Sequence, residues 1–252
     1  MAGAEERGTR AVGIAGGVHA TVALVELITF AVTGCWILLA DAARAAVAAA
    51  HHGLVLRAGR KVLAAGAGHP DGHGSEHHYW PAVLAGVASA VVAGVALVRG
   101  VGLILDPPSG SVWRPPAFAV LVVAAAAGAV VLRVAAGAAD ELRGRAGWVR
   151  FVRHAGTPAL PVALTAAVAA VVAALLGAAA VGVWYLAAER AWEGAGVVAV
   201  GAVLAAVAVT HAVTSRSLLV GRSATRRDVE SIAAAIEVDP SVTRLVVLST
   251  RH

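Results

Sequence analysis

Residues 158–180 read PALPVALTAAVAAVVAALLGAAA, an apolar stretch of 23 residues without a charged side chain. In an α-helix, about 20 apolar residues cross a hydrocarbon core that is roughly 30 Å thick. Backbone polar groups in lipid are satisfied only within a helix or a closed barrel, and this stretch lacks the polar–apolar alternation of barrel strands. The stretch therefore predicts a transmembrane helix.

Five similar stretches lie elsewhere in the chain, separated by polar or turn-forming residues. Hydrophobic residues make up 59% of the sequence and charged residues 14%, and the mean hydropathy is +0.80, well outside the range of a soluble domain. We therefore expect an all-α membrane protein with six transmembrane helices, surrounded by a lipid bilayer. The predicted spans are residues 11–31, 36–56, 81–103, 116–138, 158–180 and 194–215.

The positions of the basic residues predict the orientation of these spans. When both termini lie on one side of the membrane, that side also collects the basic clusters that follow the second, fourth and sixth spans. The opposite loops offer only Arg114 and Arg190, beside Asp106, Glu189 and Glu193. The positive-inside rule then predicts a multi-pass protein of the cell membrane with both termini in the cytoplasm. The same basic loops account for the net charge of +5, so the charge calls for no nucleic acid partner.

The chain changes character after the last span. Residues 223–238 carry apolar side chains at helical spacing, and residues 242–248 are rich in β-branched residues, as a strand is. One helix and one strand cannot bury a core alone, so this tail is a remnant, an incomplete domain or a piece that pairs with another chain. The predicted organisation is a cytosolic N-terminal tail at residues 1–10, a transmembrane domain at residues 11–215 and a truncated cytosolic αβ region at residues 216–252.

A histidine-rich segment, HPDGHGSEHHYW at residues 69–80, joins the second and third spans. Four histidines and two carboxylates fall within these 12 residues, and imidazole and carboxylate groups are ligands of zinc, cobalt, nickel and manganese. The alternative is a solvated start of the third helix, in which glycines make the turn and Tyr79 and Trp80 anchor at the membrane interface. The candidate metal ligands of this segment are His69, Asp71, His73, Glu76 and His77.

Few ionisable residues lie inside the predicted spans, and because a charge within a membrane is costly, each one points to a function. Asp41 and Arg44 are three residues apart, which predicts either an ion pair or a replacement cation site with Asp41 as a ligand. His51 and its neighbour either join the loop histidines at a metal or are solvated at the interface. Glu26 could face Arg44 or His19 across a helix pair. The residues considered as candidates are His19, Glu26, Asp41, Arg44, His51, His52 and His211.

Sequence motifs of common enzymes are absent. No HExxH, CxxC, Walker or GxSxG pattern occurs, so hydrolytic and nucleotide-dependent activities have no support and no organic cofactor is expected. The single cysteine, Cys35, cannot form an intramolecular disulfide. We therefore expect a protein that is not an enzyme.

Five segments follow one another in a characteristic order: WILLADAARAAVAAAHHGLVL, HPDGHGSEHHYW, TPALPVALTAAVAAVVAALLG, SRSLLVGRSA and IEVDPSV. The most specific pieces are LLADA, the HP-x-G-x-G-x-E pattern and LL-x-G-x-S-A. In this order they resemble the cation diffusion facilitator family, most closely the branch whose loop usually reads HPFGYGRERYFW, over nearly the whole chain. The resemblance implies a six-helix homodimer that exports zinc or a related divalent cation from the cytosol in exchange for protons. It also implies a ferredoxin-like cytosolic domain after the sixth helix.

The metal-binding positions of that family carry over incompletely. The second helix of family members brings a His or Asp and, four residues later, an Asp. Aligned on LLADA, these positions hold Arg44 and Ala48. The fifth helix brings another such pair or an acidic triplet, which falls on Leu164, Thr165 and Ala166. The histidine-rich segment does keep the two histidines, at positions 69 and 73, whose equivalents in some members contribute to a cytoplasm-facing zinc site.

Two functions follow from these residues. The first is a proton-coupled transporter of a divalent metal cation such as zinc, with Asp41, Glu26 or the histidines of the second span as replacement ligands. The second is a non-transporting member of the same family that acts as a membrane scaffold or as a metal-responsive regulatory partner. Either function implies zinc or another divalent cation as the bound group, and neither implies an organic cofactor.

Overall fold

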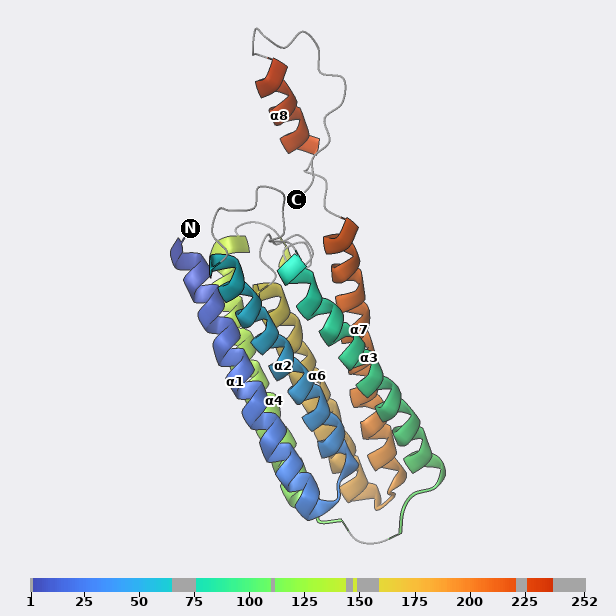
Figure 1. The fold of residues 1–252 in the computed structure, drawn as a ribbon. Helices are drawn as coiled ribbons and strands as arrows, with labels where there is room; N and C mark the ends of the chain where they lie inside the picture. The colour runs from blue at the N-terminus through green and yellow to red at the C-terminus, as the bar shows by residue number, and fades with distance from the viewer. Residues whose placement is uncertain are drawn as a thin grey trace.

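The computed structural model describes residues 2–64, 76–109, 112–143, 147–148, 159–220 and 226–237 of the chain. Within these ranges the regular structure is helical and contains no strand, which confirms the all-α prediction for this part of the chain. The helices are α1 Ala2–Thr33, α2 Trp36–Ala64, α3 Glu76–Leu105, α4 Arg114–Arg143, α6 Ala159–Ala187, α7 Ala191–Val220 and α8 Arg226–Glu237. The six long helices, α1 to α7, run side by side in one bundle (Figure 1).

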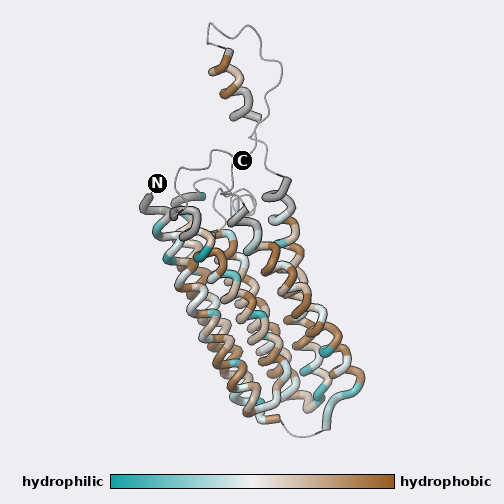
Figure 2. Tube along the Cα trace, in the orientation of Figure 1, coloured by the Kyte–Doolittle hydropathy of each residue, from teal (hydrophilic) through white to brown (hydrophobic). Residues whose placement is uncertain are grey.

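Five of the six long helices are long and apolar enough to cross a membrane. These are α1, α3, α4, α6 and α7, which hold candidate spans of 25 to 28 residues. Their outer surfaces carry large apolar side chains, such as Leu24, Val98 and Leu175, which are 58%, 77% and 53% exposed. Hydrophobic residues cover most of the bundle's length (Figure 2). A surface of this kind is matched to lipid and not to water, so the chain is a multi-pass membrane protein.

Helix α2 differs from the other five because it carries several polar residues. It packs against α1, α3, α6 and α7 and lies in the middle of the bundle (Figure 1). Asp41, Arg44, His51 and His52 are each at most 3% exposed, so their side chains face protein and not lipid. These polar residues lower the mean hydropathy of α2, which is not among the candidate spans. The other five long helices confirm five of the six predicted spans.

Glycines let α3 and α7 approach each other closely. A Cβ atom on Gly194 would lie 2.6 Å from the carbonyl oxygen of Gly100, and one on Gly100 would lie 2.9 Å from the carbonyl oxygen of Gly194. The same applies where α7 meets α2, because a Cβ atom on Gly196 would lie 2.5 Å from the Cδ1 atom of Ile37. Small residues at helix crossings are a common way to bring membrane helices into contact.

A polar network ties the helices together at the end of the bundle that lies opposite the N-terminus. The carboxylate of Glu193, which is fully buried, accepts a hydrogen bond from the backbone N–H of Trp36 at 2.7 Å and so caps the first turn of α2. Arg190 pairs with Glu193 at 3.1 Å and donates a hydrogen bond to the carbonyl oxygen of Pro108 at 2.6 Å. The turn at Gly34, which has a φ of +71°, brings the chain from α1 into α2 beside this network.

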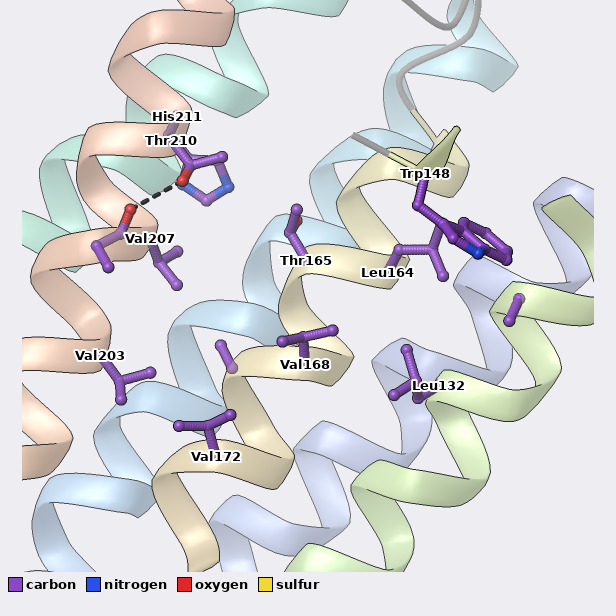
Figure 3. A pocket seen from close by; sticks show the side chains of 13 residues that line it. Leu132, Trp148, Leu164, Thr165, Val168, Val172, Val203, Val207, Thr210 and His211 are labelled. Carbon is purple, nitrogen blue, oxygen red and sulfur yellow. Dashed lines mark hydrogen bonds between the residues drawn. The ribbon is translucent and has the colours of Figure 1, made fainter. Parts of the chain in front are cut away.

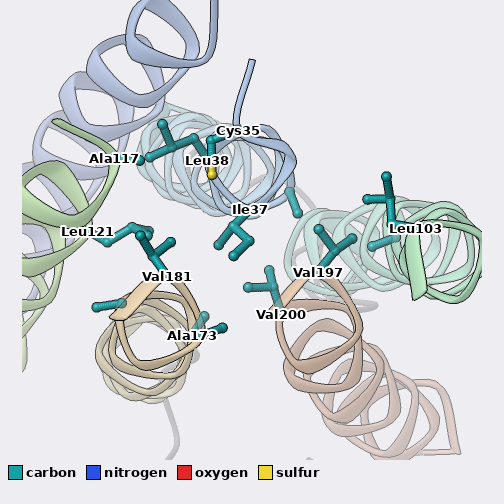
Figure 4. Close-up of a cluster of buried hydrophobic side chains, with 14 of the residues drawn as sticks. Cys35, Ile37, Leu38, Leu103, Ala117, Leu121, Ala173, Val181, Val197 and Val200 are labelled. Atoms are coloured by element: carbon teal, nitrogen blue, oxygen red, sulfur yellow. The ribbon is translucent and has the colours of Figure 1, made fainter. Parts of the chain in front are cut away.

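The apolar core of the bundle lies next to that network. Ile37 and Leu38 of α2 meet Leu121 of α4, Val181 of α6 and Val197 of α7, all almost fully buried (Figure 4). The core leaves α2 little freedom to rotate or slide. The polar residues one to four turns further along α2 are therefore held on a fixed face toward the centre of the bundle.

Two helices extend past predicted domain boundaries. Residues 2–10, predicted as a cytosolic tail, are helical and continuous with α1. The last long helix likewise continues beyond residue 215 to Val220. Helix α8 confirms the helix predicted within residues 223–238, whereas the strand predicted at residues 242–248 lies outside the described residues.

Candidate functional site

A row of buried ionisable residues runs along the centre of the bundle. Positions 41, 44, 48 and 51 fall on one face of α2, because they are three or four residues apart. The neighbouring helices add His19 and Glu26 from α1 and His211 from α7. The row consists of His19, Glu26, Asp41, Arg44, His51, His52 and His211, each at most 7% exposed. Ionisable residues buried at this depth are costly and mark functional sites in membrane proteins.

Asp41 and Arg44 form a bidentate ion pair. Arg44 donates from Nε to the Oδ1 atom of Asp41 at 2.5 Å and from Nη2 to Oδ2 at 3.0 Å. The Asp41 side chain is completely buried and that of Arg44 is 3% exposed. The ion pair predicted from the spacing of the two residues is therefore confirmed. Both carboxylate oxygens of Asp41 already accept a hydrogen bond from the guanidinium, whose positive charge would oppose the binding of a metal ion at Asp41.

Glu26 adds a second carboxylate to this pair. Its side chain is completely buried, and neither of its oxygens accepts a hydrogen bond from the described residues. It lies close enough to Asp41 and Arg44 to interact with both charges. Two carboxylates facing one guanidinium leave one negative charge uncompensated, and a buried unpaired charge is strongly destabilising. A bound proton or a bound cation must therefore complete the charge of this core.

The four histidines form a chain of three ring contacts further along α2. His19 stacks on His52 with ring centroids 5.3 Å apart, and His51 meets His211 edge to face at 4.7 Å. The rings of His51 and His52 are tilted to each other, with centroids 6.4 Å apart. The Nδ1 atoms of His19 and His52 lie 2.7 Å and 2.5 Å from the carbonyl oxygens of Ala15 and Ala48, four residues before each. A carbonyl oxygen only accepts, so Nδ1 carries the proton in both rings, and Nε2 of the neutral ring is left as an acceptor. His19 was one of the two partners predicted from the sequence for Glu26. In the structure the ring of His19 contacts that of His52.

A small cavity of about 20 Å³ lies beside the ion pair. Four polar atoms without a hydrogen-bond partner among the described residues belong to side chains that line it, and we call them the open polar atoms. A cavity of this size is large enough for a single water molecule, which needs about 10–15 Å³. The open polar atoms are Nη1 of Arg44, Nε2 of His51, Oγ of Ser89 and Nδ1 of His211.

Two alanines also line this cavity. Ala48 of α2 and Ala166 of α6 stand at positions where the family resemblance expects metal ligands, and both face the same space as Arg44. Their short methyl groups leave this space unfilled. Within the described part of the chain, no group of three or more His, Cys, Asp or Glu residues is placed to hold a metal ion. Asp41 and His51, two of the predicted ligands, do not come together at a common point.

The remaining predicted ligands belong to the histidine-rich segment. His69, Asp71 and His73 lie outside the described residues. Glu76 and His77 lie in the first turn of α3, and their side chains are also outside the description. A metal site in this segment therefore stays a prediction.

Sequence reasoning missed two contributors to the cavity. Ser89 is an isolated serine in an apolar stretch, and this isolation was the only sign in the sequence that it could belong to a site. His211 was recognised as a buried ionisable residue, but nothing in the sequence places it next to His51, which is 160 positions earlier. The contact depends on how α7 packs against α2.

No protein-family model matches this chain. No curated protein matches it either. The likeness to cation diffusion facilitators therefore rests on the order of segments in the sequence.

Proposed function

We propose that this protein is a membrane transporter of the cation diffusion facilitator type, which moves a divalent cation such as zinc out of the cytosol in exchange for protons. The observation that carries the proposal is the buried core at Glu26 and Asp41. Two carboxylates share one guanidinium there, and the missing positive charge has to come from a cation or a proton. A site that needs one or the other suits a protein that exchanges them. In the empty state Arg44 occupies the place of the cation on Asp41.

The convergence of three positions supports the resemblance to this family. Arg44 and Ala48 of α2 and Ala166 of α6 line one cavity, although Ala166 is far from the other two in the sequence. They are the positions to which the family's ligands carry over. This agreement favours the cation-efflux type of bundle. The assembly that the resemblance implies is a homodimer.

The topology that we propose has six spans and cytoplasmic termini. Helix α2 contacts four other long helices and buries its polar groups against them, as expected of a helix that crosses the membrane inside a bundle. With six spans, the N-terminus and the end of α7 lie at the same end of the bundle (Figure 1). The histidine-rich segment is then cytoplasmic as well. Its candidate ligands would capture the metal before it enters the membrane.

The second candidate function is a non-transporting member of the family that serves as a scaffold or a metal-responsive regulator. The bidentate pair between Asp41 and Arg44 favours it, because a permanent cation already neutralises the carboxylate. In this case a regulatory metal would bind only at the histidine-rich segment.

Zinc uptake into liposomes separates the two functions. The full chain is reconstituted in vesicles that contain a zinc-sensitive dye, and the wild type is compared with Asp41→Asn. Asp140→Asn is the matched control, because Asp140 pairs with Arg143 at the same spacing but on the surface. We expect uptake above that of empty vesicles for the wild type and the control, and a loss of at least about tenfold for Asp41→Asn. Uptake no faster than in empty vesicles, with zinc binding that is lost in His69→Ala, would favour the regulator.

A further inference from the structure

An apolar groove opens toward the lipid between α4, α6 and α7 (Figure 3). Its volume is about 650 Å³, within the range of sites that bind small molecules. Leu132, Leu164, Val172 and Val203 are among the side chains that line it. Val168, also in its wall, is 47% exposed, so the groove is open to the side and not closed within the bundle.

The polar residues of the groove gather toward one end. Thr165 and Thr210 lie there together with His211 (Figure 3). The two threonine hydroxyls already donate to carbonyl oxygens of their own helices, at Pro161 and at Ala206. His211 is different, because the described residues supply no partner for its Nδ1 atom. It is the polar group at this end that remains open to a ligand.

His211 also connects the groove with the small cavity beside the ion pair. Ala169, Val207 and His211 line both spaces. The other three open polar atoms, on Arg44, His51 and Ser89, therefore lie just behind the end of the groove. For a molecule in the groove to reach them, its leading end must pass between the side chains that line both spaces.

The chemistry of the two spaces defines the ligand. The groove fits an alkyl chain or an apolar ring. In the cavity, Arg44 has an N–H without an acceptor and Ser89 has a hydroxyl that can donate, so an oxygen acceptor fits between them. A cavity of about 20 Å³ admits a single oxygen but no phosphate or other large headgroup. A neutral head is favoured over an anion, because Asp41 already balances the charge of Arg44.

We propose that the groove and the cavity form one binding site for a neutral lipophilic molecule that carries a single hydroxyl or carbonyl oxygen. The apolar part lies along α6 and α7, and the oxygen takes hydrogen bonds from Arg44 and Ser89 beside His51 and His211. The ligand enters sideways from the bilayer. This site does not depend on cation transport, and the two proposals can fail separately.

Photolabelling tests this site. The full chain in lipid nanodiscs is exposed to hexadecan-1-ol that carries a diazirine in its chain, and to hexadecane with the same diazirine. We expect saturable labelling of α6 and α7 by the alcohol, competed by unlabelled hexadecan-1-ol about tenfold better than by hexadecane. Val168→Trp should fill the groove and abolish the labelling. Val98→Trp is the matched control, because Val98 is 77% exposed on α3 and lies outside the groove.

The oxygen-binding end has its own test. Ser89→Ala and His211→Leu should each reduce the preference for the alcohol over the alkane by roughly fivefold, since each removes one hydrogen-bonding group. Elution as a single species and an unchanged thermal midpoint show that the variants are folded, and the two substitutions provide independent readings. Equal labelling by alcohol and alkane would mean that the groove holds ordinary acyl chains. Cross-links between two copies through the groove would mean that a second protein molecule fills it. Either result overturns the proposal.

Discussion

Arg44 balances one of the two carboxylates in the polar core of the bundle. Its guanidinium holds Asp41 through two hydrogen bonds and also faces Glu26, so three buried ionisable groups depend on one another. In such a place the loss of one partner is more damaging than the loss of the pair, because the remaining charge stays buried. Single substitutions at this site therefore report on the structure as well as on the proposed transport.

Asp41→Ala is expected to lower the free energy of unfolding by about 3–5 kcal/mol, because it removes both hydrogen bonds that the buried guanidinium of Arg44 donates to Asp41. The measurement is the thermal unfolding midpoint of the purified protein in detergent micelles. Asp140→Ala removes the acidic partner of a surface pair with the same spacing and should change the midpoint little. Equal midpoints for the two variants would contradict the buried pair.

Cys35 provides a test of the turn between α1 and α2. The thiol is completely buried, and this burial, together with the nearby Glu193 carboxylate, raises its pKa to about 12. The reactive thiolate is then scarce at neutral pH, so maleimide should label Cys35 at least about 100-fold more slowly than an exposed thiol. Because the pKa is raised, labelling should accelerate as the pH rises toward it. Asp140→Cys in a Cys35→Ala background is the exposed reference, and similar rates at the two positions would show that Cys35 is accessible.

At this scale, the sequence predicted contacts within one helix and missed contacts between helices. The spacing of Asp41 and Arg44 was enough to predict their ion pair. The hydrogen bond from the backbone N–H of Trp36 to Glu193 joins residues 157 positions apart, and no local pattern signals it. Ser89 was missed for the same reason, because its contacts depend on which helices surround it.

Helices were predictable because the membrane demands a long apolar stretch for each crossing. Five spans agree with the prediction, and the helix that differs, α2, is polar because it is enclosed by the others. Helix ends were harder to predict, since α1 and α7 continue beyond the apolar stretches where nothing in the sequence breaks a helix. The close crossing of α3 and α7 also escaped prediction, because glycine is abundant along the whole chain.

Gly194→Ala tests the crossing of α3 and α7. The new Cβ atom would meet the carbonyl oxygen of Gly100 at 2.6 Å, so the two helices must move apart, at an expected cost of about 1–3 kcal/mol. The thermal midpoint in detergent should fall. Gly102→Ala is the control on α3, because nothing lies within 4 Å of a Cβ atom there and alanine favours helix. A lower midpoint for Gly102→Ala than for Gly194→Ala would argue against this crossing.

The number of membrane crossings decides whether the two ends of the chain lie on the same side of the membrane. If α2 crosses the membrane, Arg10 and Ser231 lie on the same side; if it does not, they lie on opposite sides. In a Cys35→Ala background, Arg10→Cys and Ser231→Cys should both resist an impermeant thiol reagent in intact cells and react after the membrane is opened. Labelling of only one of the two positions in intact cells would contradict six spans.

The whole molecule combines a lipid-matched exterior with a polar core that lacks one positive charge. Its exterior and its helical class could be predicted from hydropathy alone, whereas the core arises from four helices that meet in space. The proposed exchange of a cation and a proton depends on that core, and Glu26 is the carboxylate for which the described residues supply no hydrogen-bond partner. A substitution of Glu26 is therefore the strongest test of the proposed function.

The most direct measurement is zinc uptake by proteoliposomes under an imposed pH gradient, for the wild type and for Glu26→Gln. Glutamine keeps the size of the side chain but cannot carry the negative charge that attracts a cation or proton. We predict zinc uptake that depends on the gradient in the wild type and falls to the level of empty vesicles in Glu26→Gln. Wild-type uptake equal to that of empty vesicles, or uptake that Glu26→Gln leaves unchanged, would contradict cation exchange at this core.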